Sequence, residues 1–385
     1  MLLKLSILTV LMLQSAVVLA VTQSTFWKLE KVASGFGVPW GLAFVDDRKL
    51  LITERSGGLK LLNVATGTVQ SISGAPKVLA EGQGGLLDVA IPKQLTEAFL
   101  MGGSKPGWIY FTYSKPVGDN AATTLARARL QGNRLTNLTD LLVTKSVTGT
   151  GYHYGSRIAF KIDEQDPAKS TVFFSVGDRG KRPNGQDLSN HAGTVLRLYL
   201  DGSVPKDNPF VGAQGALPEI WSYGHRNPQG LAYDPIADRL WMIEHGPRGG
   251  DEINLIKKGR NYGWPVVSHG KEYWGPFSVG EAEQKPGMEP AVKVYVPSIA
   301  PGSLLIYSGK AFSHWAGSLM SGALKLTHIN RVDINSKAEA VHEERLLGDL
   351  NERIRAIVES AEGGIYFSTD SGDIYRILPH YPSKK

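Results

Sequence analysis

The sequence of 385 residues contains no cysteine. No disulfide can therefore hold the fold together, and core packing, with or without a bound metal, must do so. Apolar residues are plentiful enough for this, because 42% of the residues are hydrophobic and only 20% are charged. A chain of this composition and length is expected to bury a real core, either in two ordinary domains or in one large β-architecture.

The sequence also lacks the short motifs of several common enzyme classes. It contains no His-Glu-x-x-His, no Walker loop and no Gly-x-Ser-x-Gly elbow. The stretch GTGYHYG at residues 149–155 is rich in glycine but does not open a helix after a strand, so no nicotinamide-binding fold is predicted. If the protein is a redox enzyme, its cofactor must be of another kind.

A strong excess of one charge is missing too. Lys and Arg number 42 against 36 Asp and Glu, which gives a formal net charge of +6. No run of Lys or Arg would follow a phosphate backbone, so nucleic acid is not an expected partner. A small anionic ligand remains open.

A long apolar run occurs only at the N-terminus. Lys4 precedes the run LSILTVLMLQSAVVLA, and Val18 and Ala20 put short side chains at the usual −3 and −1 cleavage positions. The run is too short to span a membrane comfortably, and no later segment reaches about 18 uninterrupted apolar residues. We expect residues 1–20 to be a secretory signal peptide and the chain to be periplasmic or secreted after its cleavage. An uncleaved anchor is the alternative.

The rest of the chain repeats one pattern, in which a short β-branched and aromatic run, an acidic or glycine-containing turn and a second short run follow one another. Such alternation predicts antiparallel β-structure. Six imperfect copies at a spacing of roughly 45 to 80 residues, with no Pro/Ser linker, predict a β-propeller over residues 21–385 with six four-stranded blades. A pair of β-sandwiches is the alternative. The copies lie at residues 50–63, 108–114, 172–180, 240–256, 319–334 and 365–378.

Propellers bind ligands around the central channel, so functional residues should be scattered along the sequence. Several polar residues lie where loops or strand ends are predicted, and each has an ordinary structural explanation if it is taken alone. Together they would supply one base and four cations, which is enough to hold a polycarboxylate. They are Gln83, His153, Arg226, Asn227, Lys325, Arg353 and Arg355.

One further stretch, EHGPRGGDEINLIKKGRNYGWP at residues 244–265, combines glycines with the acidic pair Asp251 and Glu252. From the residues alone, a solvated surface turn and a loop folded around a cation are equally good interpretations.

Two long segments of the chain resemble a known family. HRNPQGLA at 225–232 and DEINLIKKGRNYGWP at 251–265 are similar to the soluble quinoprotein sugar dehydrogenases, the glucose/sorbosone dehydrogenase group that uses pyrroloquinoline quinone (PQQ) and calcium. The similarity covers nearly the whole mature chain, from VPWGLAF through EGQGGLLDVAI, HYGSRIAF, SIAPGSLLIYSG and ALKLTHINRVD to NERIRAI. It is greatest to the bacterial periplasmic aldose sugar dehydrogenase branch. The resemblance implies a six-bladed propeller, as the repeats do.

The resemblance implies a role for each scattered polar residue. His153 matches the general base that takes a proton from the anomeric hydroxyl of an aldose, and Gln83 matches a residue beside it that contacts sugar or cofactor. Arg226 and Asn227 match residues over the quinone carbonyls, where Arg would stabilise developing negative charge. Three cations match the set that holds the cofactor carboxylates; they are Lys325, Arg353 and Arg355.

The glycine-rich stretch is implied to bind calcium. The backbone carbonyls of Gly246 and Pro247 match ligands of a calcium at the cofactor, which would act as a Lewis acid. Asp251, Glu252 and Tyr262 match a second, structural calcium site.

Three positions depart from the family pattern. Tyr152 stands where glucose-oxidising members have Asp, so a carboxylate that orients His153 must come from elsewhere in the chain or be missing. His245 stands where some members have a neutral amide, which puts the second calcium site in question because calcium prefers oxygen ligands. A tryptophan near the sugar is replaced around Tyr295 and Val296, which puts the preferred sugar in question.

The resemblance thus implies a PQQ- and calcium-dependent enzyme that oxidises aldoses at the anomeric carbon to lactones. Electrons would pass to an external acceptor such as a quinone, a cytochrome or a dye, and a monomer is favoured. A calcium-dependent propeller lactonase is an alternative, but it would not need Lys325, Arg353 and Arg355. A non-catalytic binding propeller is the third hypothesis.

Overall fold

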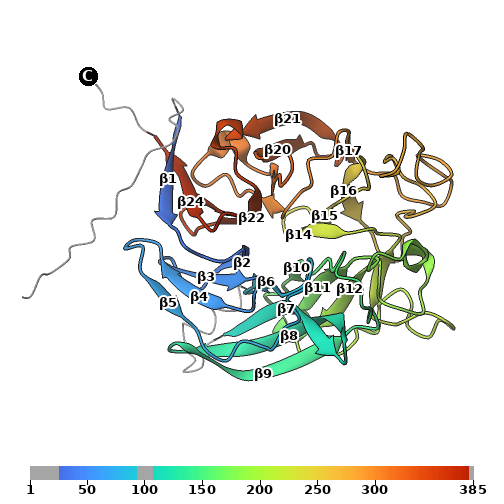
Figure 1. Ribbon diagram of the computed structural model, residues 1–385, viewed down its shortest axis with the longest axis horizontal. Coiled ribbons are helices and arrows are strands. Elements are labelled where there is room, and N and C mark those ends of the chain that lie inside the picture. The colour runs from blue at the N-terminus through green and yellow to red at the C-terminus, as the bar shows by residue number, and fades with distance from the viewer. Residues whose placement is uncertain (1–25, 93–106, 381–385) are drawn as a thin grey trace, which may run out of the picture.

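The computed structural model describes residues 26–92 and 107–380, and within them it is a six-bladed β-propeller (Figure 1). Each blade is a four-stranded antiparallel sheet, as the repeats predicted. The described residues contain no helix longer than a single short 3₁₀ turn. These turns are η1 (Pro167–Lys169), η2 (Arg182–Gln186), η3 (Ser313–Trp315) and η4 (Gly348–Leu350).

Five blades are formed by four consecutive strands each. The first two contain β2 (Pro39–Phe44), β3 (Lys49–Glu54), β4 (Leu59–Asn63) and β5 (Val69–Ser71), then β6 (Leu86–Ala90), β7 (Trp108–Val117), β8 (Asn120–Gln131) and β9 (Arg134–Val143). The third contains β10 (Ile158–Lys161), β11 (Thr171–Val176), β12 (Thr194–Tyr199) and β13 (Ile220–Tyr223). The fourth contains β14 (Pro228–Asp234), β15 (Arg239–Glu244), β16 (Asp251–Ile256) and β17 (Lys293–Tyr295). The fifth contains β18 (Leu305–Ile306), β19 (Leu319–Gly322), β20 (Ile329–Ile334) and β21 (Ala340–Leu346).

The sixth blade joins the two ends of the described chain. It consists of β22 (Ile354–Glu359), β23 (Ile365–Thr369), β24 (Ile374–Pro379) and, at its edge, β1 (Trp27–Ala33). β1 pairs antiparallel with β24, from Trp27 opposite Pro379 to Ala33 opposite Ile374 (Figure 1). This pairing closes the ring and covers a sheet edge that would otherwise expose unpaired N–H and C=O groups.

The buried apolar residues form seven clusters among the described residues, and six of these each fill the space between two neighbouring blades. Tyr110 of β7 packs with Phe174 of β11, for example, and Leu50 of β3 packs with Ile374 of β24. Successive residues of a strand point to opposite faces of its sheet. Because each blade packs between two neighbouring blades, its strands bury both faces. This explains why short, nearly continuous apolar runs predicted the blades.

Three of the innermost strands are irregular at the residue that faces the channel. The pairing register shifts at Trp40 in β2, at Gln229 in β14 and at Arg355 in β22. A β-bulge bends a strand and re-aims the side chain at the extra residue. All three side chains line the same channel cavity, so the bulges help to build it.

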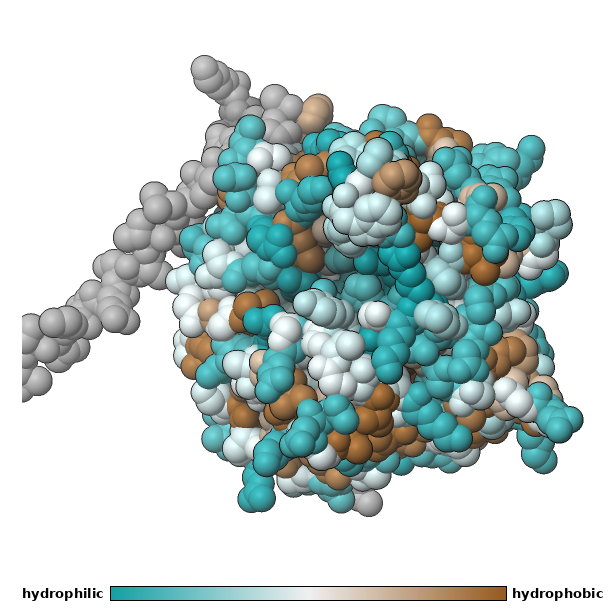
Figure 2. Space-filling view, turned by 45° about the vertical axis from the view of Figure 1, so that its right-hand side comes forward, coloured by the Kyte–Doolittle hydropathy of each residue, from teal (hydrophilic) through white to brown (hydrophobic). Residues whose placement is uncertain are grey.

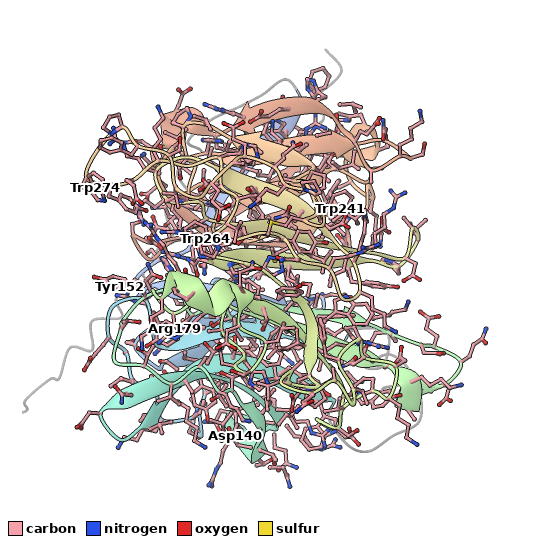
Figure 3. The ribbon with its side chains drawn as sticks, turned by 90° about the vertical axis from the view of Figure 1, so that its right-hand side faces the viewer. Asp140, Tyr152, Arg179, Trp241, Trp264 and Trp274 are labelled. Atoms are coloured by element: carbon pink, nitrogen blue, oxygen red, sulfur yellow. The ribbon has the colours of Figure 1, made fainter. Side chains whose placement is uncertain are left out.

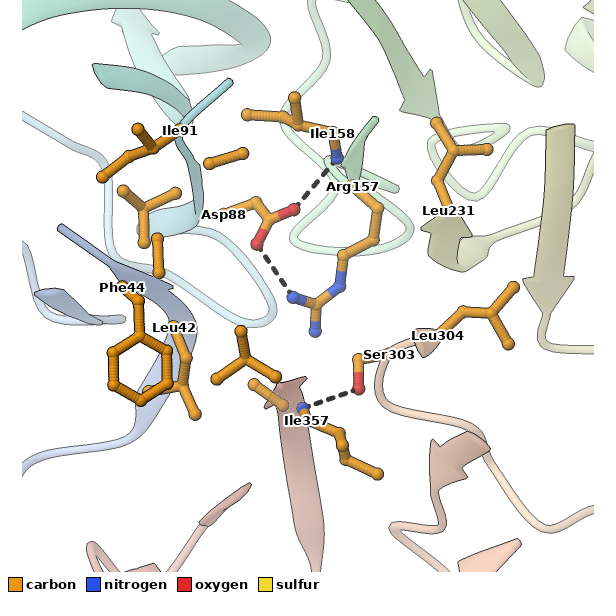
Figure 4. A pocket seen from close by; sticks show the side chains of 15 residues that line it. Leu42, Phe44, Asp88, Ile91, Arg157, Ile158, Leu231, Ser303, Leu304 and Ile357 are labelled. Carbon is orange, nitrogen blue, oxygen red and sulfur yellow. Dashed lines mark hydrogen bonds and ion pairs between the residues drawn. The ribbon is translucent and has the colours of Figure 1, made fainter. Parts of the chain in front are cut away.

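Arg157, just before β10, joins all six blades at the centre of the channel. Its guanidinium is buried and lies 3.8 Å from the ring centroid of Trp40. Figure 4 shows its ion pair with Asp88, whose second oxygen accepts from the N–H of Ile158 at 2.9 Å. The guanidinium donates to Asp88 at 3.0 Å and to the carbonyls of Gln229 at 2.7 Å, Arg355 at 3.3 Å, Trp40 at 3.4 Å and Gly302.

The predicted signal peptide, residues 1–20, lies outside the described residues. Within the part of the chain that the structure describes, we find no helix of the length and apolar character needed to cross a membrane.

Candidate active site

The channel widens on one side of Arg157 into a cavity of about 280 Å³. Figure 2 shows hydrophilic residues gathered around a hollow in the middle of the molecular surface. The cavity is lined by four residues that the sequence pointed to as site residues, Gln83, Asn227, Arg353 and Arg355, and by His245. A smaller cavity of about 180 Å³, lined mostly by apolar residues, includes Arg157 in its wall (Figure 4).

His153 is held by a carboxylate that the sequence analysis did not identify. Its Nδ1 lies 2.7 Å from Oδ1 of Asp178, which is almost completely buried. Tyr152, by contrast, is 58% exposed and has no carboxylate, so the orienting carboxylate does come from elsewhere in the chain. The available signal was the acidic residue in VGDRG, directly after β11, but nothing local in the sequence connects it with His153.

Asp178 is fixed from three sides. Its Oδ1 also accepts from the N–H of Gly180 at 2.7 Å, and its Oδ2 accepts from Nε1 of Trp264 at 2.8 Å. An ionised carboxylate can only accept hydrogen bonds, so it selects the imidazole tautomer of His153 with the proton on Nδ1. Nε2 of His153 is then left with a lone pair that can accept a proton.

The main chain around His153 is packed closely. Gln83 accepts from the N–H of His153 through Oε1 at 2.8 Å and donates its own N–H to the carbonyl of Gly151 at 2.8 Å. Gly82 has a φ of 57°, and a Cβ there would lie 2.5 Å from the carbonyl oxygen of Gly151. A Cβ on Gly177 would lie 2.3 Å from the carbonyl oxygen of His153. Gly82, beside Gln83, thus allows the loop that contains Gly151 to approach closely. Gln83 itself holds His153 directly, through the hydrogen bond to its N–H.

Arg226 lies at the carbonyls that the resemblance assigned to calcium. Its Nη1 donates to the carbonyl of Gly246 at 2.8 Å and to that of His245 at 3.2 Å. The carbonyl of Pro247 accepts from the hydroxyl of Tyr273 at 2.9 Å.

Asn227 is buried and lines the cavity. Its Oδ1 accepts from Nε2 of Gln229 at 3.1 Å, so the two amide side chains lie next to each other in the lining. His245 also lines the cavity, and its Nε2 donates to the carbonyl of Pro301 at 2.7 Å. Burial lowers the pKa of His245 to about 4, so this imidazole is neutral at ordinary pH.

Arg353 and Arg355 meet at one carboxylate. Nε of Arg353 and both Nε and Nη2 of Arg355 donate to Asp370, each at 2.9 Å. Burial alone would raise the pKa of Asp370, but the charges and hydrogen bonds of the two arginines outweigh burial and hold it below its usual range. Lys325 is exposed and is not part of the cavity lining, although its neighbour Leu324 is and accepts from Arg353 at 2.8 Å.

Two of the residues predicted to bind the second calcium have their polar atoms engaged in the protein. Asp251 is completely buried and accepts from the N–H of Gly246 at 3.0 Å, from Ser298 at 2.7 Å and from the N–H of Ala300 at 2.8 Å. The hydroxyl of Tyr262 donates to the carbonyl of Leu255 and accepts from the N–H of Lys257. The ring of Tyr262 stacks on His225, with centroids 4.8 Å apart.

Glu252 has a different environment. Burial, together with the charge of neighbouring Glu244, raises its pKa to about 8. Both carboxylates accept from Nδ2 of Asn254, at 3.3 Å from Glu252 and 3.1 Å from Glu244, whereas Oδ1 of Asn254 is buried without a hydrogen-bond partner. Among residues 26–92 and 107–380, no three His, Cys, Asp or Glu side chains converge as a metal centre. A cation here would therefore need backbone or amide oxygens as well.

The tryptophan position of the family pattern falls at the edge of this region. Tyr295 is buried and donates its hydroxyl to Oδ1 of Asn330 at 2.6 Å, while Val296 is 70% exposed. The aromatic side chain of Tyr295 thus belongs to the protein interior.

The fold and the site define a class of protein, a six-bladed propeller with a histidine–aspartate pair and a pair of arginines at one channel. Comparison with known proteins identifies the family. The family model described as Glucose / Sorbosone dehydrogenase matches residues 36–376, and the chain belongs to this family.

Two relatives of this chain are named as sugar dehydrogenases. The chain is 37% identical over 350 residues to aldose sugar dehydrogenase YliI of Escherichia coli (strain K12), covering 89% of this chain and 90% of that protein. It is 27% identical over 423 residues to quinoprotein glucose dehydrogenase B of Acinetobacter calcoaceticus, covering 88% of this chain and 84% of that protein. The crystal structure of the soluble aldose sugar dehydrogenase from Escherichia coli in its apo-form superimposes with a TM-score of 0.83 at 34% identity, covering 92% of this chain and all of that one.

Proposed function

We propose that this protein is a PQQ- and calcium-dependent aldose dehydrogenase that oxidises the anomeric carbon of an aldose to a lactone. The observation on which the proposal rests is the 2.7 Å contact between His153 and Asp178, near a cavity lined by Arg353 and Arg355. The first pair suits a general base, and the second suits an anionic cofactor.

The proton is assigned to His153. In the oxidation, the anomeric carbon loses a hydride and the anomeric hydroxyl loses a proton, which gives the lactone. Nε2 of His153 takes the proton, and the carboxylate of Asp178 stabilises the imidazolium that forms. Gln83 keeps the backbone of His153 in place through its 2.8 Å hydrogen bond.

The cavity has the donors that a PQQ tricarboxylate requires. The bonds to Asp370 and Leu324 use Nε and Nη1 of Arg353, and those to Asp370 use Nε and Nη2 of Arg355, so one terminal nitrogen of each guanidinium remains for a ligand carboxylate. We assign Lys325 to the rim of this set, and Arg226 and Asn227 to the quinone carbonyls. When bound, PQQ supplies the electrophile that accepts the hydride. An external acceptor would then remove the two electrons.

Calcium fits the oxygen-rich stretch 244–254. A carbonyl oxygen has two lone pairs, so Gly246 and Pro247 can each accept from Arg226 or Tyr273 and still face a cation. Burial and neighbouring Glu244 raise the pKa of Glu252 to about 8, so this carboxyl group is protonated at neutral pH and would ionise on binding a cation. Together with the unpartnered Oδ1 of Asn254, this favours a second cation, for which hard oxygen ligands suit calcium. When bound beside the cofactor, calcium supplies a Lewis acid. We keep Asp251 and Tyr262 as predicted members of the second site, where a bound cation would replace part of the hydrogen bonds that their side chains now make.

The proposal is tested by reconstitution. Apo-protein is mixed with PQQ and Ca²⁺, and reduction of a dye acceptor is followed with several aldoses, beside a lactone-hydrolysis assay without PQQ. Dye reduction that needs both additions supports the proposal. No reduction with any aldose would refute it, and lactone hydrolysis without PQQ would support the calcium-dependent lactonase instead. Absence of both activities together with tight sugar binding would indicate a binding propeller.

The location is proposed from the N-terminus alone. We propose that residues 1–20 direct export and that the reaction takes place in the periplasm or outside the cell. Analysis of the mature N-terminus by mass spectrometry would test this, and a chain that retains Met1 would contradict it.

A further inference from the structure

The loop that leads into His153 is held by its carbonyl groups. The carbonyl of Gly151 accepts from the N–H of Gln83 at 2.8 Å. The carbonyls on either side of it, those of Thr150 and Tyr152, both accept from the guanidinium of Arg179, the former at 3.0 Å. Three consecutive carbonyls are thus bonded by two residues from other parts of the chain.

Arg179 both donates hydrogen bonds to this loop and accepts one from it. Its own carbonyl accepts from Oγ1 of Thr150 at 2.6 Å, and its guanidinium lies 3.5 Å from the ring centroid of Tyr154. Arg179 is only 1% exposed, and Figure 3 shows it next to Tyr152. Its direct partners are carbonyls and a ring, rather than a carboxylate. Burial of a guanidinium among neutral partners is unfavourable for stability, which favours a role in the site over a role in the core.

We propose that Arg179 is a positioning residue for His153. Asp178 and Arg179 are consecutive, and they hold two parts of the same element: Asp178 holds the imidazole ring, and Arg179 holds the main chain that leads to it. Only the part of this inference that concerns turnover rests on the proposed function of His153 as a general base.

The backbone of His153 explains why such a tether is needed. His153 has a φ of 52°, in the left-handed region that side chains other than glycine rarely adopt. Such a conformation persists only where the surroundings impose it. Without the bonds to Thr150 and Tyr152, the loop can relax toward a more favourable φ, and the ring then leaves Asp178. A displacement of about 1 Å at a reacting group costs about 100-fold in rate.

The test measures the position of His153 in the apo-protein and its turnover after reconstitution. Proton NMR of the apo-protein follows the downfield resonance of the imidazole N–H held by Asp178, assigned by its loss in His153→Ala. In Arg179→Met we expect this resonance to be lost or broadened by exchange, and kcat to fall about 100-fold with a smaller change in KM. Arg179→Lys, which can reach one carbonyl, should recover part of both. An unchanged resonance and kcat in Arg179→Met would overturn the proposal.

A matched control separates positioning from stability. Arg197 also lies over an aromatic ring, 4.9 Å from the centroid of Trp221, and it does not line the cavity. Arg197→Met should lower Tm but keep the resonance and kcat. If Arg179→Met does not fold, Arg179→Lys takes its place, because it keeps the charge and can reach only one of the two carbonyls. A wild-type resonance in Arg179→Lys, at wild-type kcat, would then contradict the proposal.

Different results would refute the proposed dehydrogenase function and the proposed positioning role of Arg179. If the wild-type protein shows no dehydrogenase activity with PQQ and Ca²⁺, the proposed function is wrong. The apo-protein resonance still decides whether Arg179 positions His153.

Discussion

Nδ1 of His153 lies 2.7 Å from Oδ1 of Asp178, although 24 residues separate the two in the sequence. His153 comes before β10 and Asp178 comes after β11, and these strands pair antiparallel with Ile158 opposite Phe174. The entry to one strand and the exit from its antiparallel partner lie at the same end of the blade. The blade topology therefore supplies the carboxylate that Tyr152 does not.

Asp178→Asn should lower kcat strongly with little loss of stability. Asn can present its NH₂ group to the ring, which would favour the tautomer with the proton on Nε2, and the base would then be blocked. We expect kcat to fall by about 10⁴-fold, as in other histidine–aspartate pairs. Steady-state kinetics of the reconstituted protein checks this, with Asp207→Asn as the control because Asp207 pairs with Arg197 away from the cavity. Equal losses in the two variants would contradict the assigned role.

Arg355→Met should weaken PQQ binding more than Arg353→Met. The side chain of Arg355 is 14% exposed, whereas that of Arg353 is 53% exposed, and a charge-assisted bond in a less solvated site is stronger. Loss of a hydrogen bond to a charged group costs about 1.5–3 kcal/mol, which is roughly a 10- to 150-fold loss of affinity for Arg355. Quenching of tryptophan fluorescence on titration of the apo-protein with PQQ measures the affinities. The reverse order of effects would mean that the cofactor lies elsewhere.

Asp370→Asn should make the free energy of unfolding depend less steeply on pH in the acid range. The pKa of Asp370 is lowered in the folded protein, so its carboxylate stabilises the fold above the unfolded pKa of about 3.9. That contribution disappears as pH falls through the lowered pKa of the folded state, and the variant has no such contribution to lose. Urea unfolding between about pH 2 and pH 6 compares the two slopes. Parallel curves would show that Asp370 is not linked to folding.

Arg157→Met should destabilise the whole propeller. The substitution leaves the buried carboxylate of Asp88 without its partner and frees the carbonyls that Arg157 joins across the channel. Breaking a buried ion pair from one side typically costs about 3–5 kcal/mol. Urea unfolding measures the loss, and Lys161→Met, which removes an exposed ion pair with Asp238, should change stability by less than about 1 kcal/mol. A small effect of Arg157→Met would show that the blades hold together without this contact.

The fold was predictable from the sequence because its evidence is local. Each blade repeats a short apolar run, a turn and another run, and strands that are buried on both faces need such runs. The closure of the ring was not visible in this pattern, because β1 pairs with β24 across the whole chain.

The site was predictable in part. The motifs pointed to Gln83, Arg353 and Arg355, which line the cavity, and to His153, whose catalytic role stays a prediction, but not to Asp178, Arg179 or Arg157. Their roles depend on loops that meet only after the strands have paired. Asp251 and Tyr262 stand out in the sequence as possible ligands, yet burial directs their side-chain atoms to protein partners.

The most direct test of the central claim is a comparison of wild-type protein with His153→Ala after reconstitution with PQQ and Ca²⁺. Rapid mixing with an excess of aldose follows reduction of the cofactor by its absorbance, and titration beforehand verifies that both proteins bind PQQ equally. We predict that His153→Ala reduces its cofactor about 100- to 10,000-fold more slowly, the range expected for loss of a general base. Reduction at the wild-type rate by a fully loaded His153→Ala protein would contradict the account.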